Sequence, residues 1–156
     1  MKYFYGLTSH DDLVTFSKRV CDCLGHGKNH SAVDLLIETA GAETVRGTFE
    51  DPTKFAGMGL TQFDKMPFQD VKDRTSKANK LKIFNTFGIH LDHVVWEHLR
   101  YSPLLALIMT RLKYMLIPEH IPPDFEDRAR YWKKHYNTIA GKGTEEHYIY
   151  QNMKFM

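Results

Sequence analysis

Apolar residues recur at helical spacing along most of this chain, and capping residues mark where the runs begin and end. The first run contains Leu13, Phe16 and Val20 on one face, with Ser9 before it and Gly25 after it. A serine at the start and a glycine at the end are typical of a helix with both ends capped. The pattern therefore predicts a helix between Ser9 and Gly25, and similar patterns predict that most of the chain is helical.

A second helix is predicted to begin at Ser31 and to end at Ala40-Gly41, since glycine commonly terminates helices. This interpretation places Glu38 in the last helical turn, after the apolar residues Leu35-Leu36-Ile37. The negative end of the helix dipole disfavours a charged carboxylate there. Glu38 is therefore expected to hold its proton, as a general acid must.

Helical periodicity is lost over residues 42–63, where glycines at 47, 57 and 59 indicate tight turns. We interpret this stretch as a β-hairpin or small β-lobe. Helical patterns then return, with a buried helix predicted around Leu104–Met115 and another from Asp124 to Tyr136. The predicted fold class is mainly α, with a small β-hairpin lobe beside a helical bundle.

Length and composition fit one folded domain over residues 1–156, because 42% of the 156 residues are hydrophobic and 13% are aromatic. The net charge of +2 is too small to indicate a nucleic-acid partner. No apolar stretch reaches the roughly 18 residues of a membrane span, and none follows Met1 as in a signal peptide. We therefore expect a protein made in the cytoplasm, with no membrane span and no nucleic acid.

A metal site is not expected, although Cys21, Cys23, His26 and His30 are closely spaced. Residues two apart on a helix point about 200° from each other, so the two cysteines cannot share a metal ion there. Phosphate-loop and dinucleotide-binding motifs are also missing from the sequence, so no cofactor is expected.

The segment 57–63 reads Gly-Met-Gly-Leu-Thr-Gln-Phe and has the chemistry of a sugar-binding loop. Gly57 and Gly59 would let the backbone approach a ligand closely. Gln62 offers both a donor and an acceptor to a sugar hydroxyl or an N-acetyl group. A protonated Glu38 followed by such a loop predicts cleavage of a glycosidic bond.

Glu38-Thr39 and Gly59-Leu60-Thr61-Gln62 resemble the Glu-Ser and Gly-Leu-Met-Gln elements of lytic transglycosylases and goose-type lysozymes, which cleave peptidoglycan. A third segment, Arg130–Thr144, contains Tyr136-Asn137 and is similar to the Ala-Tyr-Asn-x-Gly element that closes their cleft. It also looks like the C-terminal part of phage-encoded, virion-associated lysozyme-like proteins. This chain departs from the pattern in having Thr39 for Ser, Thr61 for Met and His135 for Ala. The resemblance implies a lysozyme-like α+β fold.

The resemblance further implies that Glu38 is the general acid and base of a lytic transglycosylase. The bond cleaved would be the β-1,4 link between N-acetylmuramic acid and N-acetylglucosamine. The substrate-binding residues would be Thr39, Gly59, Gln62, Tyr136 and Asn137. The partners would be peptidoglycan glycan strands and phage structural proteins, with a place in a virion tail or neck and action in the periplasm or cell wall.

Two other functions are compatible with the same residues. A hydrolytic muramidase needs a second carboxylate to hold a water or form a covalent link, and Glu43, Glu50 and Asp51 lie in the predicted β-lobe. A virion structural or adaptor protein would keep the fold with little catalysis.

Overall fold

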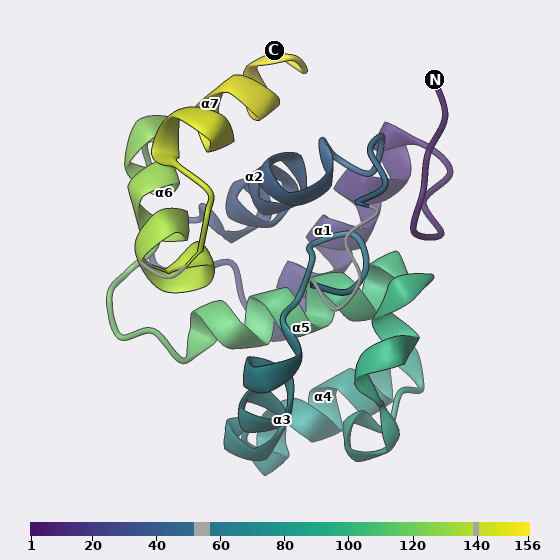
Figure 1. Ribbon diagram of the computed structural model, residues 1–156. Coiled ribbons are helices and arrows are strands. Elements are labelled where there is room, and N and C mark those ends of the chain that lie inside the picture. Colours follow the sequence, from purple (N-terminus) through teal and green to yellow (C-terminus); the bar gives the residue numbers. More distant parts are fainter. Residues whose placement is uncertain (52–56, 139–140) are drawn as a thin grey trace.

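Helices form the regular structure of the computed structural model, which describes residues 1–51, 57–138 and 141–156 (Figure 1). In chain order they are α1 (His10–Leu24), α2 (Ala32–Thr44), α3 (Lys65–Arg74), α4 (Lys77–Phe87), the 3₁₀ turns η1 (Leu91–His93) and η2 (Trp96–Arg100), α5 (Pro103–Met115), α6 (Phe125–Trp132), the π-helical turn η3 (Lys133–Asn137) and α7 (Glu145–Met153). The prediction of a mainly α fold is confirmed.

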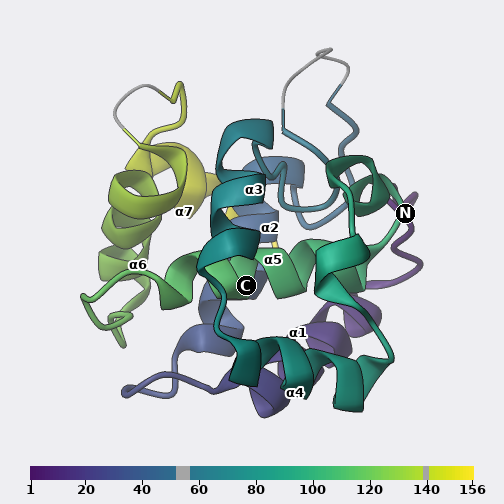
Figure 2. The ribbon, with the colours of Figure 1, turned by 90° about the horizontal axis from the view of Figure 1, so that it is seen from below.

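Helix α5 crosses the middle of the fold, as the second view shows (Figure 2). Its N-terminus is capped by Ser102, whose hydroxyl accepts a hydrogen bond from the amide of Leu105. Every side chain from Ala106 to Leu112 is buried, as expected of a helix that is apolar on most sides. Helices α1, α2 and α3 all pack against α5. The predicted buried helix in this region is therefore confirmed.

The two ends of α1 agree with the sequence prediction. The Ser9 hydroxyl accepts a hydrogen bond from the Asp12 amide at 3.1 Å, which caps the first turn. Gly25 follows the last turn with a φ of 111°, a conformation that other residues rarely adopt. Leu13 and Val20 are fully buried beneath α5 and α2.

Helix α2 is longer than the sequence predicted, because Gly41 does not end it. A Cβ at position 41 would lie 1.9 Å from Oδ1 of Asn152, a residue of α7. The glycine therefore allows α7 to pack closely against α2 rather than terminating the helix. The helix ends at Thr44 and is followed by Val45 in the left-handed conformation. This moves Glu38 into the helix interior and places Glu43 in the last turn.

The predicted β-hairpin lobe is wrong, and with it the lysozyme-like α+β fold that the resemblance implied. Within the described ranges the chain contains no strand, and the only ladder pairing there is an isolated bridge between Met58 and Phe63. The loss of helical periodicity reflects irregular loops with positive φ at Val45, Arg46 and Gln62, rather than extended chain. Residues 52–56 of the predicted hairpin lie outside the described residues.

The described helices include none that is both long and apolar enough to cross a lipid bilayer.

Candidate functional site

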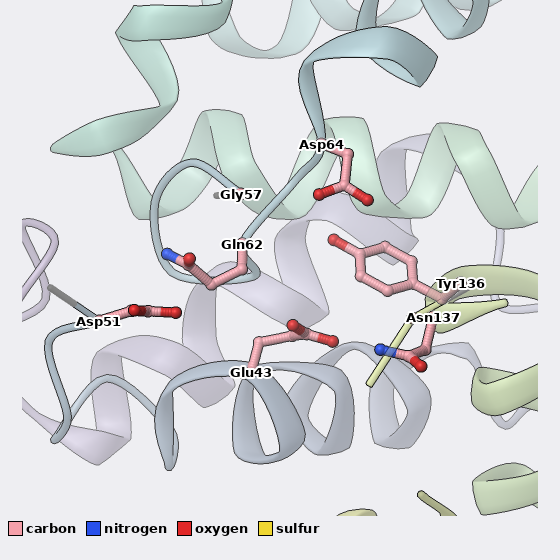
Figure 3. Close-up of a pocket in the computed structure, with 8 residues that line it drawn as sticks. Glu43, Asp51, Gly57, Gln62, Asp64, Tyr136 and Asn137 are labelled. Atoms are coloured by element: carbon pink, nitrogen blue, oxygen red, sulfur yellow. The ribbon is translucent and has the colours of Figure 1, made fainter. Parts of the chain in front are cut away.

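Glu43 lies in a pocket formed where the end of α2, the 57–64 loop and η3 meet (Figure 3). The pocket has a volume of about 190 Å³. We call it the Glu43 pocket, and its lining residues are Glu43, Asp51, Gly57, Gln62, Asp64, Tyr136, Asn137 and Gly141. Three segments that are far apart in sequence thus bring polar side chains together around one carboxyl.

The Glu43 carboxyl is held in a setting that favours its protonated form. Burial raises its pKa from the ordinary 4.5 to about 8, although the Trp132 indole donates a hydrogen bond to Oε2 at 3.0 Å and opposes the shift. The neighbouring charges of Asp64 and Asp51 raise the pKa further, and that of Lys113 lowers it. Glu43 makes no ion pair in the part of the chain that the structure describes. A half-buried carboxyl that keeps its proton near neutral pH is suited to general-acid catalysis.

The loop that carries Gln62 is folded tightly against the core. A Cβ on Gly59 would lie 2.1 Å from the carbonyl oxygen of Leu99, so only glycine fits this position. Gln62 has a φ of 45°, and its Nε2 donates to the Gly59 carbonyl at 2.9 Å. Such unfavourable backbone conformations concentrate at functional sites. Gln62 lines the pocket, whereas Gly59, predicted to bind substrate, does not line it and packs against the backbone of Leu99.

Tyr136 and Asn137 come from the π-helical turn η3, a distortion that is frequent at functional sites. The Tyr136 hydroxyl donates to the Thr61 carbonyl at 2.6 Å, so this side chain ties η3 to the loop that carries Gln62. Burial raises the pKa of Tyr136 far above its usual range. The Asn137 Oδ1 accepts from Lys133 Nζ at 2.8 Å, which orients its amide beside the pocket.

Glu38 and Thr39 point away from the Glu43 pocket. Both Glu38 oxygens are bound by Arg128, through Nε at 2.7 Å and Nη2 at 2.9 Å, and Tyr148 donates a third hydrogen bond at 2.7 Å. Thr39 is fully buried against the Tyr114 hydroxyl, at 2.8 Å. Glu38 therefore has the surroundings of a structural ion pair between α2 and α6, and the geometry does not support it as the acid.

The remaining predicted residues divide between the pocket and the surface. The structure brings Gln62, Tyr136, Asn137, Glu43 and Asp51 together, whereas Glu50 is exposed and does not line the pocket. Sequence reasoning did not single out Asp64 or Trp132. Asp64 directly follows the glycine-rich loop, and Trp132 belongs to the C-terminal segment that carries Tyr136, so proximity to these motifs was the available signal. Residues 139–140 of that segment lie outside the described residues.

A second, larger hollow of about 510 Å³ adjoins the Glu43 pocket and shares Glu43, Asp51 and Asn137 with it. We call it the α7 hollow, because its far wall is helix α7. Glu43 therefore lies between two concave surfaces. An extended ligand could occupy both of them and pass over the Glu43 carboxyl. Among the described residues, no group of three or more histidine, cysteine or acidic side chains is arranged to hold a metal ion.

Comparisons of the chain with protein-family models, with curated proteins and with solved structures gave no match.

Proposed function

We propose that this protein cleaves the β-1,4 bond between N-acetylmuramic acid and N-acetylglucosamine in peptidoglycan, with Glu43 as the general acid. The observation that carries the proposal is a carboxyl of raised pKa at the junction of two hollows, in a pocket that Gln62 and Asn137 of the two loop motifs also line. Amide groups beside a protonated carboxyl suit the hydroxyl and N-acetyl groups of an aminosugar.

The resemblance to lytic transglycosylases applies to Glu43 as well as it does to Glu38. Thr44 follows Glu43 as Thr39 follows Glu38, so each glutamate stands before a hydroxyl residue. The two carboxyls point about 140° apart around the helix, given roughly 100° per residue. The side that faces Gln62 and Tyr136 is the side of Glu43.

In the proposed reaction, Glu43 donates its proton to the glycosidic oxygen while the bond from that oxygen to C1 of the muramoyl residue breaks. The N-acetylglucosamine part leaves as an alcohol, and positive charge develops at C1. The Glu43 carboxylate then accepts the proton of the muramoyl C6 hydroxyl, whose oxygen bonds to C1 and closes a 1,6-anhydro ring. No water is consumed, and Glu43 ends the cycle protonated.

Hydrolysis is the second candidate, because Asp51 and Asp64 line the same pocket as Glu43. Either carboxylate would hold a water against C1 or stabilise the positive charge there. The same acid step would then end in a reducing sugar.

Product analysis tests the proposal and separates the two reactions. Purified peptidoglycan is digested with the wild-type protein, and the soluble muropeptides are weighed by mass spectrometry. We expect anhydro products, each lighter by one water than its reducing counterpart, and none from Glu43→Gln. Reducing products alone would assign hydrolysis, and no soluble product from the wild type would refute glycan cleavage. Association with a phage particle stays a prediction from sequence.

A further inference from the structure

The α7 hollow differs from the Glu43 pocket in the charge of its walls. Apart from the shared Glu43 and Asp51, its described lining contains two lysines, Lys142 and Lys154, and no acid. The Glu43 pocket adds Asp64 to the shared carboxyls, and its described lining contains no cation. A ligand that crosses Glu43 thus passes from an acidic surface to one with basic side chains.

Lys142 lies in the loop before α7 and Lys154 directly follows its last residue, and the helix packs against α2 (Figure 1). His147 is anchored by its Nε2–H, which donates to the carbonyl of Ala42 at 2.9 Å and leaves Nδ1 unused by that bond. The Lys154 ammonium donates a hydrogen bond to Gln151 Oε1 at 2.8 Å and lies 4.9 Å from the centre of the Tyr150 ring. Lys142 is exposed and makes no ion pair among the described residues.

The floor of the α7 hollow is apolar. Phe49 is 52% exposed although it is a large hydrophobic side chain, and it stands at the rim. Trp132 forms the buried base, and Gly143 packs on it so closely that a Cβ there would lie 2.6 Å from the indole ring. An apolar floor with a basic rim suits a ligand that combines aliphatic parts with carboxylates.

We propose that the α7 hollow binds the stem peptide that hangs from muramic acid, with Lys142 and Lys154 meeting its carboxylates. The inference rests on the proposed function. The acidic Glu43 pocket would repel the same carboxylates, so the charge difference sets the direction in which a strand lies across Glu43. The muramoyl residue is thereby placed on the α7 side of the acid.

The test compares two forms of one substrate: glycan strands that carry stem peptides, and the same strands stripped of them by an amidase. The double variant Lys142→Gln/Lys154→Gln should lose about tenfold in kcat/KM on stem-bearing strands, which corresponds to about 1.4 kcal/mol. It should lose less than about twofold on stripped strands. The loss should fall mainly on KM, because the lysines bind the substrate away from the reacting bond.

The charge-matched control is Lys77→Gln/Lys82→Gln on α4, which lies away from α7 (Figure 1). It should behave as the wild type on both substrates. Equal losses of the Lys142/Lys154 variant on both substrates, or no loss on either, would overturn the inference while leaving glycan cleavage intact.

A binding measurement separates this failure from failure of the proposed function. A soluble disaccharide-peptide is titrated into Glu43→Gln by calorimetry, with the peptide-free disaccharide as the comparison. The peptide should tighten binding, and adding Lys142→Gln/Lys154→Gln should remove about tenfold of the affinity. Equal affinities for the two ligands would refute stem recognition, whether or not the wild type cleaves peptidoglycan.

Discussion

Helix α2 carries two glutamates, each followed by a threonine, and their surroundings in the folded protein differ. Glu38 is buried, yet Arg128 binds both of its oxygens and Tyr148 adds a third donor. Glu43 is half-buried, receives one hydrogen bond from Trp132 and has carboxylates as neighbours. Burial alone therefore does not make an acid catalyst. What matters is whether a cation compensates for the water that the carboxylate loses.

The largest expected effect is on activity. Glu43→Gln should reduce glycan cleavage by about 10²–10⁴-fold, because the isosteric amide has no acidic proton. Glu38→Gln should keep the wild-type rate per folded molecule, measured below its own unfolding midpoint. If Glu38→Gln proves too unstable, Glu38→Met/Arg128→Met preserves the packing and must remain active. A loss confined to the Glu38 variants would reverse the assignment.

The free energy of unfolding should fall when Glu38 rather than Glu43 is replaced, which is the reverse of what we expect for activity. Glu38→Gln should lower the free energy of unfolding by about 3–5 kcal/mol, because it leaves the Arg128 guanidinium buried without its partner. Replacing both partners with methionine should recover much of the loss. Glu43→Gln should not lower the free energy of unfolding at neutral pH but raise it, because the amide folds without taking up the proton that the Glu43 carboxyl must take up. Urea denaturation of the wild type and the three variants measures this, and equal losses at positions 38 and 43 would contradict the comparison.

Gly41→Ala tests whether the close packing of α7 against α2 is what requires glycine at position 41. Alanine normally favours a helix interior, but its Cβ would lie 1.9 Å from Asn152 Oδ1. We expect a net loss of about 1–3 kcal/mol in the free energy of unfolding. In an Asn152→Ala background the same substitution should cost less or become favourable, and the double-mutant cycle measures the coupling. Additive effects would show that the close approach is not what requires glycine.

The raised pKa of Glu43 predicts a pH dependence of stability. Between pH 4.5 and about 8 the folded protein holds a proton that the unfolded chain has released. The stability contributed by this group is therefore present below pH 4.5 and falls as the pH rises to about 8. The difference in unfolding free energy between the wild type and Glu43→Gln should follow this direction. A difference that is flat with pH, or that grows in favour of the wild type, would contradict the raised pKa.

Local sequence predicted the fold where local contacts decide it. Ser9 and Gly25 delimit α1 through their own hydrogen bond and backbone conformation, and the apolar run after Pro103 forms the buried α5. The predicted end of α2 was wrong because Gly41 is there to allow close contact with Asn152, which lies near the other end of the chain. The prediction of a β-lobe was wrong because the turn residues in this segment form irregular loops rather than a hairpin.

The candidate site was predictable in part, for the same physical reason. The loop motif led to Gln62, and the C-terminal segment led to Tyr136 and Asn137, all of which line the pocket. The sequence does not distinguish Glu38 from Glu43, since threonine follows each of them. The choice depends on which glutamate meets Arg128, and that contact joins residues distant in sequence.

The pKa of the Glu43 carboxyl is the most direct test of the account. Protein labelled with ¹³C at the glutamate side-chain carboxyl is titrated by NMR, and the Glu43 signal is identified by its loss in Glu43→Gln. We predict that this signal titrates near pH 8, far above the ordinary 4.5. Titration at or below the ordinary value would contradict the account, because Glu43 would then be charged at neutral pH and unable to act as the acid.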